Sequence, residues 1–414
     1  MTTVSPSGIA TASQGGKPTP SQEGILSWMR RRWLAIVAFA VVLAFPFFDF
    51  TADAIVHVRV LSDAGVFVLM ALGLNIVVGY AGLLDLGYVA FFTLGAYAYA
   101  IANFGNIHRV AGGLAYVTPG NPLHIGGTEI HIAVWPMFIG GLAIAALFGI
   151  LLGAPTLRLR GDYLAIVTLG FGEIVPVVFH NNDALGGAFG YTGLDLPSIG
   201  DFHFTFLDPV PFYYLIVALC FIAVLIVLSI RNSRFGRAWI AIREDETAAA
   251  ASGVNLVRTK LLAFSMGAAL GGVAGVFFAS HLSTVTYDQF DFSISIQVLL
   301  MVVLGGMGSI PGVMVGAVVV YWVDFYLLGS VNSFFHDHGI IKDPSFDLDN
   351  IRNLLYGLVL IIMMILRPEG LIPSARRKRE IHEQEIRPED GAVDALDAPP
   401  GLGIVGNPDG ELHA

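Results

Sequence analysis

Residues 211–230 read PFYYLIVALCFIAVLIVLSI and contain no charged side chain. A run of this length and composition matches the roughly 20 apolar residues that an α-helix needs to cross the hydrocarbon core of a bilayer. The residues that follow, 231–260, read RNSRFGRAWIAIREDETAAAASGVNLVRTK and have the opposite character. The first stretch predicts a membrane-spanning helix, and the second predicts a polar element outside the membrane.

The composition of the whole chain places it in the same class. Of 414 residues, 55% are hydrophobic and only 13% are charged, whereas soluble domains carry about 25% charged residues. Further apolar runs lie at 33–50, 64–79, 83–104, 130–153, 163–181, 261–280 and 351–366. Lipid offers no partner to an open sheet edge, so all spans must be helical. We therefore expect an all-α polytopic membrane protein.

Clusters of Lys and Arg predict the topology. They lie at residues 30–32, at Arg158 and Arg160, throughout 231–260, and at 376–379. By the positive-inside rule these segments are cytoplasmic, so both termini are inside. The loop at 182–211 contains four aspartates and neither Lys nor Arg, and is expected outside.

This topology constrains residues 294–325, which must cross the membrane an even number of times. The segment is too long for one straight helix and too short for two full spans. Its centre contains Gly305, Gly306 and Gly308, followed by Pro311. We predict two short helices joined by a break, and about ten helical passes in total. Irregular backbone at membrane depth is tolerated only where protein buries it or where it lines a wet cavity. The break is therefore a candidate part of a transport pathway.

The two ends of the chain read as tails. Residues 380–414 hold nine acidic residues and one arginine, and so supply most of the net charge of −10. Polar, Pro- and Gly-containing segments of this kind are typical of disorder. We expect a disordered cytoplasmic tail at 1–29, a transmembrane domain at 30–373 with its cytoplasmic loop at 231–260, and an acidic disordered tail at 374–414.

Motifs for catalysis, metals and nucleotides are missing from the sequence. The single cysteine, Cys220, lies within a predicted span, so no disulfide can form within the chain and no metal cluster is indicated. No Gly-Lys-Ser or Gly-Lys-Thr phosphate loop occurs. The chain is expected to be no enzyme and to need no cofactor, and if ATP drives it, another chain must hydrolyse the ATP.

The cytoplasmic stretch 231–260 predicts a docking surface for such a partner. Glu246, Ala248, Ala249 and Gly253 combine a charged start, small side chains and a glycine end. Small residues allow another protein to approach closely, as a compact helix seated in a groove does. The alternative is a helix at the membrane interface, held near anionic lipid by its arginines.

Polar residues inside the predicted spans are candidates for a substrate path. They are Asn75, Asp85, Thr93, Thr168, Glu173 and Gln297. An ionisable residue inside a span, such as Glu173, marks a functional site by default, with a hydrogen-bonded structural carboxyl as the alternative. Asp85 is expected to cap the start of the helix that follows it. The uncharged members serve more often as hydrogen-bonding contacts between helices.

Four motifs in order resemble one transporter family. They are LGLNIVVGYAGLLDLGYVAFFTLGAYAYA at 72–100, LRLRGDYLAIVTLGFGEIV at 157–175, the 231–260 stretch, and VVLGGMGSIPGVMVGA at 302–317. They resemble LivM-type permease subunits of branched-chain amino-acid ABC importers.

The resemblance implies a bacterial inner-membrane subunit that moves branched-chain or related hydrophobic amino acids. The implied partners are a second homologous permease, two cytoplasmic ATPase subunits, an extracytoplasmic substrate-binding protein and the lipid bilayer, with no nucleic acid. In this family, Glu246, Ala248, Ala249 and Gly253 match the helix that couples the permease to its ATPase. Two alternatives stay open: a permease of the same type that carries urea or short-chain amides, and a secondary transporter or channel that works alone.

Overall fold

The computed structural model describes residues 39–47, 54–104, 123–125, 128–130, 134–156, 162–199, 202–328, 352–367 and 370–372. The chain divides into two compact units, Met1–Ala54 and Ile55–Ala414. In the first unit residues 39–47 are helical, within the predicted span 33–50. The predicted tails at 1–29 and 374–414 lie outside the described residues.

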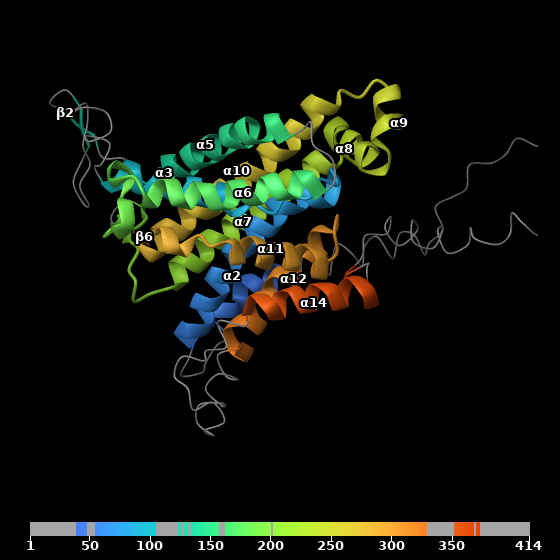
Figure 1. Cartoon of the computed structure of the whole chain (residues 1–414). Helices are drawn as coiled ribbons and strands as arrows, with labels where there is room; N and C mark the ends of the chain where they lie inside the picture. Colours follow the sequence, from blue (N-terminus) through green and yellow to red (C-terminus); the bar gives the residue numbers. More distant parts are fainter. Residues whose placement is uncertain are drawn as a thin grey trace, which may run out of the picture. The chain divides into compact units, whose positions relative to one another are not determined.

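Helices account for most of the described residues of the second unit (Figure 1). They are α2 (Ala54–Leu74), the π-helix η1 (Asn75–Tyr80), α3 (Val89–Phe104), α5 (Val134–Thr156), α6 (Asp162–His180), α7 (Val210–Arg231), α8 (Arg234–Glu244), α9 (Glu246–Ala251), α10 (Leu256–Leu282), α11 (Phe292–Gly305), α12 (Ile310–Trp322), the π-helix η5 (Val323–Leu328) and α14 (Arg352–Leu366). In this part of the chain six helices are long and apolar enough to cross a membrane, and three shorter helices are apolar. The all-α polytopic prediction is confirmed.

Two predicted boundaries were wrong. The second span starts ten residues before the predicted Ala64, because α2 continues outward through Arg59 and Asp63, whose side chains find partners near the bundle end. The third span starts at Val89 instead of residue 83. Residues 81–88 form an irregular turn, with Gly82 at φ +70°.

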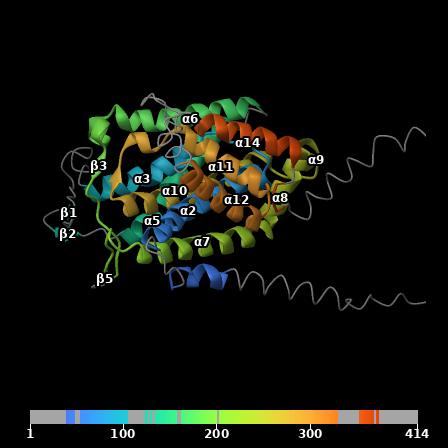
Figure 2. The ribbon, with the colours of Figure 1, turned by 90° about the horizontal axis from the view of Figure 1, so that it is seen from below.

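The strands are short and form three two-stranded antiparallel sheets. These pair β1 (Leu123–Ile125) with β2 (Thr128–Ile130), β3 (Tyr191–Thr192) with β6 (Thr284–Val285), and β4 (Ser198–Ile199) with β5 (Phe202–His203). In Figures 1 and 2 the strands lie at one end of the helix bundle, and α8 and α9 lie at the other. In the predicted topology, these are the outer and the cytoplasmic end.

Helix α10 is the packing centre of the bundle, in contact with α3, α5, α7 and α8. Its glycines let the backbones of neighbouring helices touch. A Cβ on Gly272 would lie 2.5 Å from the carbonyl oxygen of Gly141 in α5, and a Cβ on Gly95 in α3 would lie 2.2 Å from the carbonyl oxygen of Gly272. Small residues at such crossings are what helix association in lipid requires, because packing rather than water exclusion drives it.

The predicted broken pair is present as α11 and α12, which pack on each other as a hairpin. The break at 306–309 is covered by the residues after α14. Leu371 N–H donates to the carbonyl oxygen of Leu304 at 2.8 Å, and Ile372 N–H donates to that of Gly305 at 3.2 Å. Carbonyl groups at the C-terminal end of α11 therefore have hydrogen-bond partners within the protein, as buried irregular backbone requires.

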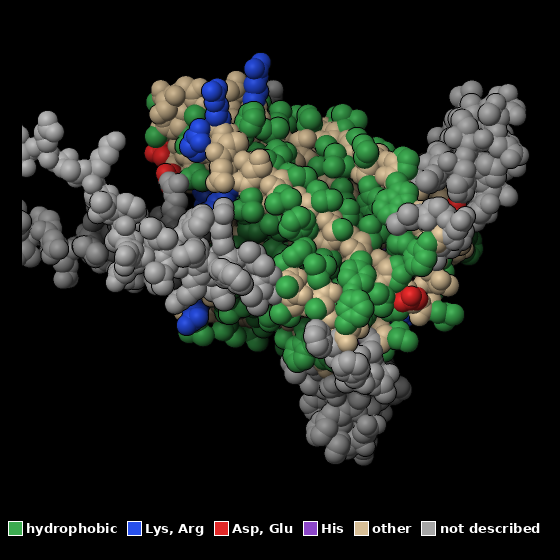
Figure 3. Space-filling view, turned by 180° about the vertical axis from the view of Figure 1, so that it is seen from behind, with side chains coloured by type: hydrophobic (Ala, Val, Ile, Leu, Met, Phe, Trp, Pro, Cys, Tyr) green, Lys and Arg blue, Asp and Glu red, His purple; other side chains and the backbone are tan. Residues whose placement is uncertain are grey.

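The flanks of the bundle are apolar. Large hydrophobic side chains on α5, α6, α7 and α14 are exposed. Figure 3 shows hydrophobic side chains over the flank, with Lys and Arg gathered at the end that carries α8 and α9. A soluble protein does not expose this much apolar surface. The arrangement is that of a multi-pass membrane protein.

We expect Gly272→Ala to destabilise the protein by about 1–3 kcal/mol, because the added methyl group collides with backbone that cannot move independently. The matched control is Gly140→Ala in α5, where the nearest atom to a new Cβ is the Met137 side chain at 3.5 Å. Thermal unfolding of the purified protein in detergent measures both. Equal melting temperatures for the two variants would contradict the proposed role of the crossing.

Candidate functional site

The end of the bundle opposite the strands carries two short helices, α8 and α9, that together form a platform. Each starts with a side-chain cap. The Ser233 hydroxyl accepts hydrogen bonds from the N–H groups of Phe235 and Gly236, and Asp245 Oδ1 accepts from Thr247 and Ala248 at 2.7 and 3.0 Å. Caps of this kind stabilise a helix by about 1 kcal/mol each, which matters for helices of this length.

Two buried contacts fix the platform to α10. Trp239, fully buried on α8, donates from Nε1 to the carbonyl oxygen of Thr259 at 2.8 Å. Lys260 is only 4% exposed and its Nζ lies 2.7 Å from Oε1 of Glu246. Removing Glu246 would leave the buried ammonium group of Lys260 without its ion-pair partner, so α9 and α10 are held together.

The four predicted docking residues divide into two roles. Glu246 pairs with Lys260, and Ala249 is 4% exposed and packs inward, so both anchor α9 to the bundle. Ala248 and Gly253 are exposed. Gly253 lies at φ +86°, which a residue with a side chain rarely adopts, and ends α9. The surface available to a partner is therefore the outer side of α9.

One side chain links the platform to the membrane-embedded part. Nη1 of Arg243, at the end of α8, donates to the carbonyl oxygen of Gly79 in η1 at 2.6 Å. The next link is Asn75 at the start of η1, whose Oδ1 accepts from the N–H of Gly308 at 2.8 Å. The platform, the π-helix and the α11–α12 break are thus joined by two hydrogen bonds to backbone atoms.

Sequence reasoning missed Arg243. Nothing in the linear sequence separates it from Arg231, Arg234 and Arg237, which are exposed. The signal that could have found it is the turn Gly79-Tyr80-Ala81-Gly82. Its Gly82 leaves room for the arginine stem, since a Cβ there would lie 2.7 Å from Cγ of Arg243.

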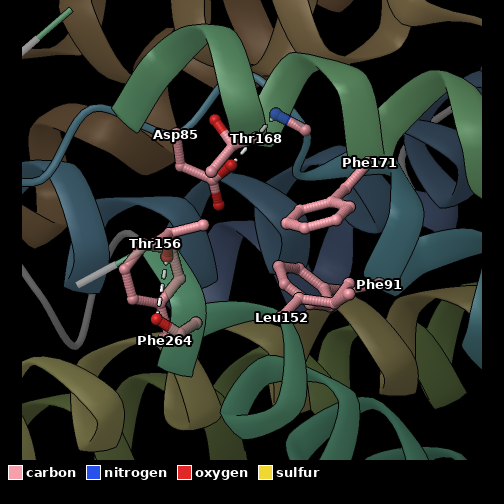
Figure 4. A pocket seen from close by; sticks show the side chains of 9 residues that line it. Asp85, Phe91, Leu152, Thr156, Thr168, Phe171 and Phe264 are labelled. Carbon is pink, nitrogen blue, oxygen red and sulfur yellow. Dashed lines mark hydrogen bonds between the residues drawn. The ribbon is translucent and has the colours of Figure 1, made fainter. Parts of the chain in front are cut away.

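A small pocket lies between α3, α5, α6 and α10 (Figure 4). The empty space in and around it is about 240 Å³, which includes space open to solvent, and the pocket itself has room for about one water molecule. It is lined by Asp85, Gly87, Phe91, Leu152, Gly153, Thr156, Thr168, Phe171 and Phe264. Asp85 and Thr168, both predicted path residues, lie together on one side of it, and the rings of Phe91 and Phe171 lie on the other.

Asp85 does not cap a helix, so that prediction was wrong. Its Oδ1 accepts from the N–H of Gly87 at 3.0 Å and holds the turn before α3. The first N–H of α3 donates instead to the hydroxyl of Ser295 in α11, at 3.1 Å. Oδ2 of Asp85 is buried with no hydrogen-bond partner among the described residues, and the side chain is 1% exposed. A buried carboxylate oxygen without a partner is costly and indicates a role beyond the turn.

Thr168 holds the same turn from the other side. Its hydroxyl accepts from the N–H of Leu86 at 3.0 Å and donates to the carbonyl oxygen of Ala165 at 3.1 Å. Together Asp85 and Thr168 fix the loop 81–88 against α6.

The other three path candidates lie elsewhere. Thr93 is fully buried and donates to the carbonyl oxygen of Val89 within its own helix. Gln297 lies 3.4 Å from Asp324, which also pairs with Arg352 at 3.0 Å and accepts from the Tyr356 hydroxyl at 2.5 Å. Glu173 is exposed on the surface of α6. The structure therefore joins Asn75 to the break and Asp85 to Thr168, and it leaves Thr93, Gln297 and Glu173 apart.

Comparison with known proteins identifies the family. The family model described as "Branched-chain amino acid transport system / permease component" matches residues 56–366, more than half of the chain. The chain belongs to this permease family.

Individual relatives agree with the assignment. The permease is 32% identical over 385 residues to the high-affinity branched-chain amino acid transport system permease protein LivM of Salmonella typhimurium, covering 88% of this chain and 80% of the relative. It is 34% identical over 372 residues to LivM of Escherichia coli, covering 84% and 77%. A shorter match, 38% over 100 residues, covers 24% of this permease and 32% of the E. coli permease protein LivH.

The relatives are transport permeases rather than enzymes, and all three names refer to branched-chain amino acids. The urea or amide alternative gains no support from them. No solved structure matches this permease significantly.

Proposed function

We propose that this permease is the membrane subunit of an ATP-driven importer for branched-chain or related hydrophobic amino acids. It works in the bacterial inner membrane, with both termini in the cytoplasm. Its partners are a second permease, two cytoplasmic ATPases and an extracytoplasmic binding protein. The observation that carries the proposal is family membership across nearly the whole described membrane domain, joined to a capped and anchored platform at the cytoplasmic end.

The platform suits ATPase docking for a physical reason. A helix can pass on a push only if it moves as one piece with the bundle, and α9 is tied to α10 through Glu246 and Lys260. Its exposed side presents Ala248 and Gly253, which let a partner surface approach closely. Exposed arginines around it, at 231, 234, 237 and 258, suit an acidic rim on the partner.

Movement of the platform would reach the membrane through Arg243. This side chain bonds the π-helix η1, and η1 bonds the break between α11 and α12. π-Helices and broken helices have backbone groups that can exchange partners, and they often lie at functional sites. Gly305, Gly306 and Gly308 are proposed here as the flexible element of the pathway, since the break is the point at which two helices and η1 meet.

The pocket at Asp85 and Thr168 is proposed as part of the inner path in its closed form. An amino acid carries an ammonium group and an apolar side chain, and the pocket combines a carboxylate oxygen without a partner with the rings of Phe91, Phe171 and Phe264. The space is too narrow for the substrate as it stands. Transport would require α6 to separate from α3 and α5.

A transporter that works alone is the less favoured candidate. Such a transporter would need its own coupling ion or gate, and the platform would have no ATPase to bind. Reconstitution of this chain by itself in vesicles, with a gradient of protons or sodium and labelled leucine, distinguishes the two. We expect no uptake without the ATPases.

The first prediction concerns docking. Ala248→Arg places a bulky charge on the exposed side of α9, so we expect at least a tenfold loss of co-purifying ATPase, equivalent to about 1.4 kcal/mol. Ala248 is a cleaner test than Gly253, where any side chain also strains the backbone. The matched control is Val257→Arg, an exposed position on the first turn of α10. Full retention of ATPase by the Ala248 variant would refute the docking surface.

The second prediction concerns coupling. Arg243→Ala removes the bond to Gly79 but leaves α9 exposed and anchored, so the ATPases should still bind while leucine uptake per ATP hydrolysed falls by about tenfold, within the usual range of coupling energies. Arg237→Ala is the control for loss of an arginine from the platform, since Arg237 bonds the nearby carbonyl oxygen of Asn232. Any loss of docking in that variant lowers uptake and hydrolysis together and leaves their ratio unchanged. An unchanged ratio of uptake to hydrolysis in the Arg243 variant would contradict the link.

The third prediction concerns Asp85. Asp85→Asn keeps an oxygen that accepts from Gly87 and removes a buried charge, so thermal stability should be equal or higher while leucine uptake falls. Asp85→Ala also removes the acceptor and should lower stability by about 1 kcal/mol. Thermal unfolding and uptake are measured on the same preparations of the complete transporter. Normal uptake by the asparagine variant would limit Asp85 to its structural role in the turn.

A further inference from the structure

Helix α6 presents an apolar face that is interrupted by one ionisable group. Tyr163, Ile166, Ile174 and Val177 are all exposed and recur at helical spacing. Glu173 lies on the same face and is exposed as well. In Figure 1 this helix runs along the front of the bundle.

The position of Glu173 along the helix places it at membrane depth. It lies eleven residues after the first residue of α6 and seven before the last. At 1.5 Å per residue these separations are about 16 Å and about 10 Å. Positive charges at the membrane surface are therefore too far away along the helix axis to form an ion pair with the Glu173 carboxylate.

Glu173 has no hydrogen-bond or ion-pair partner among the residues that the structure describes. A carboxyl group facing lipid is costly whether or not it is charged, because lipid offers it no hydrogen bond. Ionisable residues in membrane spans almost always face other protein or water. In the single subunit, the carboxyl group of Glu173 thus lacks the protein or water neighbour that it needs.

The same face has room for another helix. Gly170 is one turn from Glu173, and a Cβ built on it would meet nothing within 4 Å. Small residues allow close approach between helices in membranes. An open glycine beside a carboxyl group without a partner therefore favours protein over lipid as the neighbour.

The charge of Glu173 indicates which kind of protein packs on this face of α6. The face is one helix wide, so two copies of this chain paired about a two-fold axis through α6 would bring their Glu173 side chains close together. Like charges at membrane depth repel strongly, since little water is present to screen them. A different chain that presents a cation or a hydrogen-bond donor opposite Glu173 avoids this penalty.

We propose that the Glu173 face of α6 is the surface on which a second, non-identical permease packs, with a basic or hydrogen-bond-donating side chain opposite Glu173. This rests on the proposed function, which requires a second permease, and it adds where that permease binds and which chemistry it brings.

The test places a photo-crosslinking amino acid at Ile174 in the complete transporter, co-expressed with its partner subunits. The control carries the same group at Ile222 on α7, since the two positions are 55% and 52% exposed. Helices α6 and α7 lie on opposite sides of the bundle in Figure 2. Adducts are identified by mass spectrometry.

We expect the Ile174 variant to form an adduct with a membrane-spanning helix of a non-identical permease of the same family, and the Ile222 variant to form none. An adduct with a second copy of this chain would overturn the proposal. Absence of a protein adduct, while the second permease and the ATPases still co-purify, would overturn the proposed face but leave the proposed function intact. Absence of all co-purifying subunits from the unmodified complex would overturn both.

Substitution of Glu173 gives a second readout. Glu173→Leu should reduce the retained second permease by about tenfold, equivalent to about 1.4 kcal/mol, while Glu173→Gln should lose less because the amide still accepts a hydrogen bond. ATPase retained on the platform serves as the internal control for folding. Full retention of the second permease by the leucine variant would contradict a hydrogen-bonded or ionic contact at Glu173.

Discussion

The fold depends on the contact of backbones at the centre of the bundle, where α10 crosses α3 and α5 through Gly95, Gly141 and Gly272. In lipid no gain from excluding water pulls apolar helices together, so association relies on close packing.

Helix α10 also connects the two ends of the bundle. Its first turns hold the platform through Thr259 and Lys260. At its far end the carbonyl oxygen of Ser283 accepts from the N–H groups of Gly193 and Leu194, which ties down the outer loop. A push on the platform would thus reach the helix against which α3, α5, α7 and α8 pack.

Three irregular backbone segments lie toward the end of the bundle that carries the platform: the π-helix η1, the turn at 81–88 and the break at 306–309. Each of them makes a hydrogen bond with a side chain of another element. Arg243 donates to a carbonyl oxygen of the π-helix η1, the Thr168 hydroxyl accepts from an N–H of the turn at 81–88, and Asn75 accepts from an N–H of the break at 306–309. Regular helices satisfy their own backbone and resist change, whereas these three segments depend on contacts that a modest shift of α6 or α8 would exchange. The end next to the platform is therefore the part of the permease best suited to open and close, which agrees with the proposal that the platform is where the ATPase docks.

The sequence predicted most of the architecture because hydrophobic length and the distribution of arginine are local properties. It predicted the helical spans, the hairpin at 294–325 and the polar stretch at 231–260. It failed where two distant segments compete for one backbone group. Asp85 has the right spacing to cap a helix, yet Ser295 takes that role from 206 residues away. Arg243 looks like its neighbours until α8 folds back on η1. The predicted path residues share a polar character but do not share a location, and only Asp85 and Thr168 meet in one pocket.

By itself, the sequence determined that this chain crosses the membrane many times as helices, that one long charged stretch interrupts them, and that it contains no Gly-Lys-Ser or Gly-Lys-Thr phosphate loop. These properties depend only on the residues within each segment: its length of apolar residues, its charges and its motifs. Only the tertiary structure decided which of four candidate docking residues face outward, which arginine joins the platform to the membrane helices, and that Glu173 lies on the outer surface of α6. Those facts depend on how helices rotate about their axes when they pack, and the rotation is set by neighbours that the linear order does not reveal.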